Sequence, residues 1–162
     1  MTDTSRAITA PVLTDTDTQA AVNFLGALVR IRAQGEDTGG LFALLEHSGE
    51  RGYMSPLHRH VKDEETFLVL EGELRVEVED KKYGVGPGGL TLLPRGLSHG
   101  FVVTSPTARF LTLHTPAGFD QFIAEAWAPL GAAQPPPGPD PAELSRIAAK
   151  YGVEIVGPPL LP

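Results

Sequence analysis

The sequence contains no cysteine, so disulfide bonds and thiolate chemistry are both excluded. Basic residues are also few, with 13 Lys and Arg against 20 Asp and Glu, and the formal net charge is −7. Nucleic acids and anionic membrane surfaces attract clustered positive charge, and we therefore expect neither as a partner. Any catalysis in this chain must use histidine, a carboxylate or a metal ion.

Long apolar runs are absent as well. No segment approaches the length of a membrane span, and the N-terminal stretch MTDTSRAITAPVLTD lacks the apolar part of a secretory signal peptide. We therefore expect a cytoplasmic protein. The composition, with 41% hydrophobic and 20% charged residues, is that of an ordinary globular domain, and 162 residues are enough for one substantial core.

Glycine and proline, by contrast, are plentiful, with 18 and 15 residues, which suits many short strands joined by tight turns. Alternation of apolar and polar residues predicts strands, most clearly at 73–79, where Leu74, Val76 and Val78 share one face. Further strands are predicted at 28–32, 41–47, 65–70, 83–85, 98–103 and 109–115. Short strands at close spacing indicate an all-β sandwich or barrel rather than βαβ units.

After Pro116 the apolar spacing becomes helical, which predicts an amphipathic helix at 118–127. Residues 132–141 (AAQPPPGPDP) indicate a stiff, extended connection. Asp140 and the proline after it are typical of the start of a short helix, which would end at Gly152. No regular structure is expected for the final GPPLLP.

The pattern predicts one domain with two flanking regions. Residues 1–20 would be a loose N-terminal arm that can pack on a partner subunit. Residues 21–116 would form the β-barrel. Residues 117–162 would supply C-terminal helices and a proline-rich tail that pack on it.

Four residues carry the strongest chemical signal: His58, His60, Glu65 and His99. Alternate side chains of a strand point the same way, so the first two histidines share a face. The glutamate after the next turn can approach from a neighbouring strand, and the turn at 94–96 can bring His99 onto the same interior face. Imidazole and carboxylate together suit one divalent transition metal, namely Fe, Ni, Co, Mn, Cu or Zn.

Glu64 and Glu65 are both candidates for the carboxylate. Alternation favours Glu65, which shares a face with Phe67 and Val69, whereas Glu64 lies on the opposite face and is expected to be solvated. Three imidazoles and one carboxylate leave one or two coordination positions open, as a catalytic site requires.

Other polar residues nearby have simpler interpretations. Arg59, Lys62 and Asp63 are expected to form a charged rim, and His47 to be a polar residue at a strand end. His114 could be a hydrogen-bond donor behind the ligands or an acid or base in the pocket. The alternative, which we favour, is a strand-end residue near the surface.

Two gapped motifs resemble those of the cupin superfamily. The first motif, Gly, five residues, His-x-His, four residues, Glu, six residues, Gly, fits 52–72. The second fits Gly88, Pro94, Gly96 and His99, with Val103 where asparagine is usual, a position that does not ligate metal. The flanking stretches look like single-domain, quercetinase-like cupins, so the likeness covers roughly 24–127.

This resemblance implies a double-stranded β-helix, or jelly-roll, barrel with one or two short C-terminal helices, holding a metal at the four residues. It also implies a metal-dependent dioxygenase that acts on a flavonol-like or other enolic aromatic molecule. In the enzymes that the sequence resembles, the glutamate equivalent to Glu65 serves as the base. From the chemistry alone, Glu65 could take a proton from an enol or phenol while the metal stabilises the oxyanion.

By alternation, several mostly apolar side chains share faces with the ligands, and such a pocket suits an aromatic small molecule. The predicted substrate-binding residues are Met54, Phe67, Val69, Phe101 and, if it faces the pocket, His114. Two other functions stay open. One is a redox-neutral isomerase, decarboxylase or polyketide cyclase that uses the metal as a Lewis acid, and the other is a non-enzymatic small-molecule binder.

The outer face of the strand that carries Glu65 is also informative. Thr66, Leu68 and Leu70 form an apolar surface that needs cover, either from the helix at 118–127 or from a second subunit. Because proteins of the resembled family are commonly dimers, a homodimer is expected.

Overall fold

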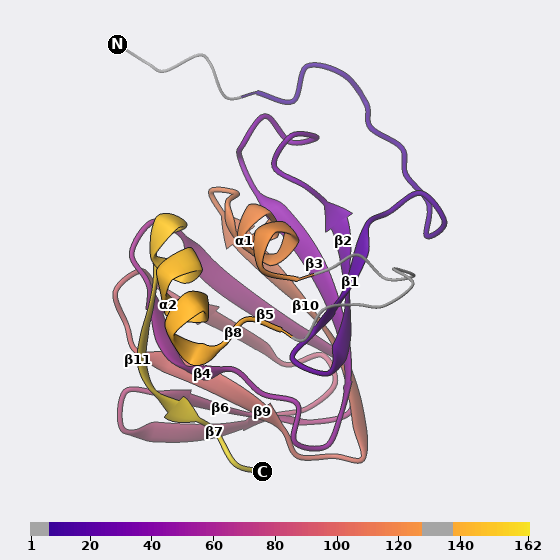
Figure 1. The fold of residues 1–162 in the computed structure, drawn as a ribbon. Helices are drawn as coiled ribbons and strands as arrows, with labels where there is room; N and C mark the ends of the chain where they lie inside the picture. Colours follow the sequence, from indigo (N-terminus) through magenta and orange to yellow (C-terminus); the bar gives the residue numbers. More distant parts are fainter. Residues whose placement is uncertain (1–6, 128–137) are drawn as a thin grey trace.

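The computed structural model of the chain describes residues 7–127 and 138–162, and it has two facing antiparallel sheets (Figure 1). The six-stranded sheet has the order β1 (Ala21–Phe24), β2 (Ala27–Ala33), β3 (Ala43–Glu50), β10 (Thr107–Thr115), β5 (Glu64–Glu71) and β8 (Leu90–Leu93). The five-stranded sheet has the order β11 (Val153–Pro159), β4 (Pro56–His60), β9 (His99–Val103), β6 (Leu74–Val78) and β7 (Lys81–Val85). The prediction of an all-β jelly-roll barrel is confirmed.

The core fills the space between the two sheets, and alternation explains which side chains reach it. Phe67 and Phe110 point inward from the six-stranded sheet, and Leu74 and Val76 point inward from the other. All four are fully buried. Burial of each such side chain contributes about 1.5–3 kcal/mol, so the facing apolar surfaces hold the two sheets together.

Two glycines set the turns that lead into functional strands. Gly72, between β5 and β6, has φ +78°, and a Cβ there would lie 2.2 Å from the carbonyl oxygen of Thr107. Gly96, between β8 and β9, has φ +82°, and its N–H donates to the carbonyl oxygen of His60 at 2.8 Å. This bond ties the turn to β4 and so places the first residue of β9, His99, beside the other histidines.

Two helices follow the barrel strands, close to the predicted positions. Helix α1 (Phe119–Ala126) begins after Gly118, and α2 (Pro141–Lys150) begins after Asp140. The Asp140 carboxylate accepts the N–H of Glu143 at 2.9 Å, as an N-cap should. Residues 132–137 of the predicted proline-rich connection lie outside the described residues. In the part of the chain that the structure describes, neither helix is long and apolar enough to cross a membrane.

The prediction that the last six residues lack regular structure is wrong for 157–159, because β11 extends to Pro159. This strand adds to the five-stranded sheet beside β4, with Val153 opposite His60 and Ile155 opposite His58. Its partner lies in the first half of the chain, and local sequence carries no sign of that pairing. The C-terminal segment therefore packs directly against the strand that bears two of the histidines.

Part of the outer face of the six-stranded sheet, over β10, β5 and β8, is apolar. Leu68 of β5 lies opposite Leu111 of β10 and Leu90 of β8, and Leu90 is 61% exposed. Helix α1 does not cover this face, because it packs against β1, β3 and α2 on the inner side (Figure 1). The prediction that the helix covers this outer face is therefore wrong, and a second subunit is the other cover that the sequence analysis considered.

Candidate metal centre

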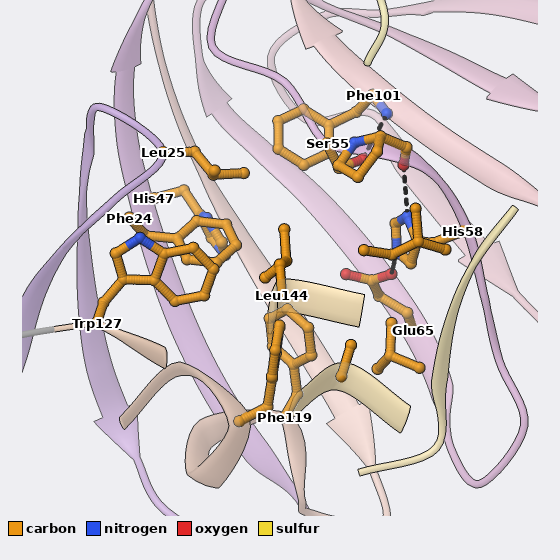
Figure 2. Close-up of a pocket in the computed structure, with 15 residues that line it drawn as sticks. Phe24, Leu25, His47, Ser55, His58, Glu65, Phe101, Phe119, Trp127 and Leu144 are labelled. Carbon is orange, nitrogen blue, oxygen red and sulfur yellow. Dashed lines mark hydrogen bonds and ion pairs between the residues drawn. The ribbon is translucent and has the colours of Figure 1, made fainter. Parts of the chain in front are cut away.

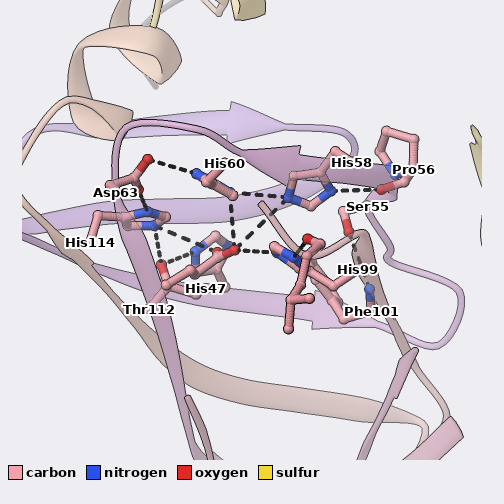
Figure 3. A network of polar contacts seen from close by, with 12 residues as sticks. His47, Ser55, Pro56, His58, His60, Asp63, His99, Phe101, Thr112 and His114 are labelled. Atoms are coloured by element: carbon pink, nitrogen blue, oxygen red, sulfur yellow. Dashed lines mark hydrogen bonds and ion pairs between the residues drawn. The ribbon is translucent and has the colours of Figure 1, made fainter. Parts of the chain in front are cut away.

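The four predicted ligands meet between the two sheets, and all of them are buried (Figure 3). His58 and His60 come from β4 and His99 from β9, with His58 directly opposite His99 in the sheet. Glu65 comes from β5 in the facing sheet rather than from a neighbouring strand of the same sheet. The cluster therefore forms only when the two sheets close on each other.

The donor atoms of the four side chains lie within 4.8 Å of one another. The Oε2 atom of Glu65 is 2.8 Å from Nε2 of His99 and 3.1 Å from Nε2 of His60. The Nε2 atoms of His58 and His60 are 3.2 Å apart. Three imidazole nitrogens and one carboxylate oxygen thus converge on a single point.

The other nitrogen of each imidazole faces an acceptor. Nδ1 of His58 donates to the carbonyl oxygen of Pro56 at 2.8 Å, and Nδ1 of His99 donates to that of Leu97 at 3.1 Å. Nδ1 of His60 faces the carboxylate of Asp63 at 3.0 Å. A neutral imidazole that carries its hydrogen on Nδ1 presents a lone pair on Nε2, so three lone pairs point inward once His60 has lost its second proton. Such close lone pairs repel unless positive charge lies between them, and this donor set fits a divalent transition metal.

The charges at the site also favour a cation. Burial raises the pKa of Glu65, but the adjacent imidazoles outweigh burial and hold this pKa well below its usual range. Burial lowers the pKa of His60, but Glu65 and Asp63 outweigh it and raise this pKa to about 10. The pKa of His58 is lowered, chiefly by burial, so its lone pair stays available. The carboxylate of Glu65 is therefore ionised at neutral pH, and the site favours positive charge at the donor atoms.

A narrow, mainly apolar cavity leads to this cluster (Figure 2). Its space amounts to about 510 Å³, including the part that opens to solvent. Ser55, His58 and Glu65 form its polar end. Aromatic side chains line most of the rest: Phe24, Phe101, Phe119, Phe122 and Trp127. The C-terminal segment adds aliphatic side chains: Leu144, Ala148, Val153 and Ile155.

Of the predicted substrate-binding residues, Phe101 lines this cavity. Phe67 and Val69 face inward but lie in the core, and they do not line it. Met54 is half-buried, bridges to Val102 and does not line the cavity either. Alternation correctly indicates which face a side chain occupies, but it does not say how deep the cavity reaches.

Three polar residues lie elsewhere than predicted. Asp63 is buried rather than part of a charged rim, and it contacts both His60 and His114. His114 is fully buried rather than near the surface, with its ring stacked on Phe119 at 4.3 Å, although it does not line the cavity. His47 is buried and lines the cavity instead of ending a strand in solvent. Each correction arises because a segment distant in the sequence covers the residue.

The predicted rim is formed only by the other two charged residues, Arg59 and Lys62, which are exposed. Glu64 points outward, as alternation predicts, and pairs with Arg95 at 2.6 Å. The contact between Asp63 and His60 has one indication in the sequence, because Asp63 lies between His60 and the proposed ligand Glu65. Nothing local, however, distinguishes it from its exposed neighbours.

Comparison with known proteins agrees with this fold and cluster. Residues 46–114 match the family model of the cupin domain. Quercetin 2,3-dioxygenase from Bacillus subtilis (strain 168) is 32% identical over 82 residues, which are 51% of this chain and 24% of the relative. The chain thus spans about a quarter of the length of that curated relative.

Solved structures share the fold at lower identity. KdgF from Halomonas sp. has a TM-score of 0.60 and 21% identity, covering 68% of this chain and 99% of its own. The polyketide cyclase RemF from Streptomyces resistomycificus has a TM-score of 0.56 and 24% identity, covering 82% of this chain and 86% of its own. The jelly-roll barrel is the cupin fold, and its buried His/Glu cluster could hold a metal ion. The match to the cupin domain covers 46–114, the part of the chain that carries all four cluster residues.

Metal uptake is expected to release a proton. Because the pKa of His60 is raised to about 10, this imidazole is protonated at pH 7.5 and must lose its proton to bind a cation. We expect Zn²⁺ binding at that pH to release about one proton, and affinity to rise about tenfold per pH unit from pH 7 to 9. Calorimetric titration in two buffers of different ionisation enthalpy measures the proton count. An affinity that stays constant over this pH range would contradict the prediction.

Proposed function

We propose that this protein is a metal-dependent dioxygenase that acts on a flavonol-like or other enolic aromatic molecule. The cation would be held by His58, His60, Glu65 and His99. One observation carries the proposal: Glu65 belongs both to the converging donor set and to the wall of the cavity. A substrate in the cavity therefore meets a carboxylate and a cation at the same place.

The cavity supports the choice of substrate class. The cavity is lined by aromatic side chains such as Phe24, Phe119 and Trp127, whose π faces and edges favour aromatic partners. An enol or phenol oxygen would then lie at the polar end, beside His58 and Glu65. The apolar walls offer little to a sugar or a phosphate, which need several polar contacts.

The residues of the chain have distinct parts in such a reaction. When bound, the metal would supply Lewis acidity that stabilises an oxyanion. Oε2 of Glu65 faces the imidazoles, while its Oε1 lies 3.6 Å from Nε2 of His114. Because Glu65 lines the cavity, its carboxylate would be placed to accept the acidic proton of an enol, and the apolar walls would keep bulk water away from the resulting anion.

The comparison with quercetin 2,3-dioxygenase, about a quarter of which the chain matches, supports the oxygenase. The main alternative is a redox-neutral isomerase, decarboxylase or polyketide cyclase. It needs the same proton transfer and the same oxyanion stabilisation, and it would use the same aromatic cavity. A non-enzymatic binder is the second alternative, for which the aromatic walls alone would suffice.

The test begins with metal analysis of protein purified without a His tag. Candidate enols, quercetin among them, are then screened with an oxygen electrode and again under argon. We expect oxygen uptake in step with substrate loss and no turnover under argon. Equal turnover under argon would contradict the oxygenase and support the redox-neutral enzyme. Saturable binding without any turnover would contradict both and support the non-enzymatic binder.

We also propose a homodimer formed through the outer face of the six-stranded sheet. Replacing Leu111 with Glu places a charge in the middle of that face, beside Leu68, and should convert the dimer to monomer. Leu161→Glu is the matched control, because Leu161 is 78% exposed and lies outside this face. Sedimentation velocity at micromolar concentration measures the difference. A wild-type protein that is only monomeric would contradict the proposal.

A further inference from the structure

Buried polar side chains outside the donor set form an unbroken hydrogen-bonded chain behind the candidate metal centre, and Figure 3 shows its part from His47 to Asp63. Its members, in order, are Tyr53, His47, Thr112, His114 and Asp63. The hydroxyl of Tyr53 is 2.8 Å from Nδ1 of His47, and Nε2 of His47 is 3.0 Å from Oγ1 of Thr112. That Oγ1 is 3.2 Å from Nε2 of His114, and Nδ1 of His114 is 3.0 Å from Oδ2 of Asp63. The other carboxylate oxygen, Oδ1, meets Nδ1 of the ligand His60 at 3.0 Å.

The carboxylate at one end fixes the direction of every bond when His47 and His114 are neutral imidazoles. An ionised Asp63 can only accept, so His60 and His114 must each donate an Nδ1–H to it. Nε2 of His114 then accepts from the hydroxyl of Thr112, whose oxygen accepts the Nε2–H of His47. Nδ1 of His47 in turn accepts from the Tyr53 hydroxyl. Each imidazole in the chain is thereby restricted to one tautomer.

His60 differs from the other two histidine ligands in how it is oriented. The Nδ1–H groups of His58 and His99 donate to backbone carbonyls, which no substitution can remove. The Nδ1–H of His60 donates to a side chain, Asp63. Asp63 is also held in place from its far side by His114, whose ring is stacked on Phe119.

We propose that Asp63 is the positioning residue of the metal centre. By accepting the Nδ1–H of His60, it holds the lone pair of Nε2 toward the cation and fixes the angle of the ring. By accepting the Nδ1–H of His114 as well, it joins the metal centre to the chain that reaches the cavity wall at His47. This inference rests on the proposed metal centre.

Asp63 with its two histidines is not a second cation site. A cation on Nδ1 of His60 as well as on Nε2 would require an imidazolate. The neighbouring Glu64 cannot share the role, because it points outward and pairs with Arg95. The adjacent carboxylates Asp63 and Glu64 therefore offer a matched comparison, in which only one touches an imidazole.

The experiment compares Asp63→Ala, Asp63→Asn and Glu64→Gln with the wild-type protein. Zn²⁺ affinity is measured by competition with a chromophoric chelator, and imidazole tautomers by ¹⁵N NMR of the Zn²⁺-loaded proteins. Loss of an acceptor behind a metal-bound histidine typically weakens binding about 10–100-fold, and we expect that loss in Asp63→Ala. Glu64→Gln removes the same charge from the adjacent position, the first residue of β5, and should stay within about threefold of wild type.

The NMR readout separates positioning from a general structural role. In the wild type we expect Nδ1–H on both His60 and His114. In Asp63→Asn an NH2 group replaces one of the two carboxylate oxygens, each of which accepts from a different ring, so one ring now faces a donor and must reverse its tautomer. Because this variant matches the wild type in shape, it carries the test even if Asp63→Ala does not fold.

Two results would overturn the inference while leaving the metal centre intact. One is Zn²⁺ affinity in both Asp63 variants within about threefold of wild type. The other is a wild-type His60 or His114 that lacks a proton on Nδ1. A wild-type protein that binds no Zn²⁺ would instead overturn the proposed metal centre, and the inference would fall with it.

Discussion

Replacing His99 with Ala is expected to remove most of the bound metal while the barrel stays folded. His99 is the donor that β9 contributes, and its Nε2 lies 2.8 Å from Oε2 of Glu65. A four-ligand zinc site is worth about 10–16 kcal/mol, so one ligand in four contributes about 3 kcal/mol. That corresponds to a loss of affinity on the order of 10²-fold. Elemental analysis after dialysis measures occupancy, and circular dichroism checks the fold.

His47→Gln is the matched control for this variant. It also replaces a buried imidazole, on β3, but His47 is not part of the donor set. Its metal content should equal that of the wild type, even if its stability is lower. Full metal occupancy in His99→Ala would remove His99 from the proposed ligands.

Replacing Glu65 with Gln is expected to separate two roles of one side chain. If Glu65 only binds the metal, extra metal should restore much of the rate of the variant. If it is also the base, Glu65→Gln loaded at high metal concentration should remain slow, because an amide cannot accept the substrate proton. General-base assistance is typically worth about 10² to 10⁴ in rate, which turnover at saturating metal resolves easily.

The rival base is His114, whose Nε2 lies 3.6 Å from Oε1 of Glu65. A metal-saturated Glu65→Gln protein with near-normal turnover would move the role to His114. His114→Gln then serves as the matched variant, because it leaves all four proposed ligands in place. At saturating metal, which offsets any loss of affinity through Asp63, it should retain most of the rate if Glu65 is the base.

The local sequence determined much of this architecture. Period-two alternation was enough to separate Glu65, which points into the barrel, from Glu64, which points out. The start of α2 could be predicted because an N-cap and the proline after it act over a few neighbouring residues. Motif spacing also placed the four candidate ligands, since the turn at Gly96 sets where β9 begins.

Only the tertiary structure decided how deep these residues lie and what they touch. Asp63 resembles its exposed neighbours in the sequence, and it is buried because β10 brings His114 against it. Strand β11 forms because β4 offers it an edge, far away in the chain. Alternation and capping are local effects, whereas burial and strand pairing depend on contacts between segments that the sequence keeps far apart. That is why the sequence could indicate the donor set, while the hydrogen-bonded chain behind it depends on the pairing of β3 with β10, which local sequence does not show.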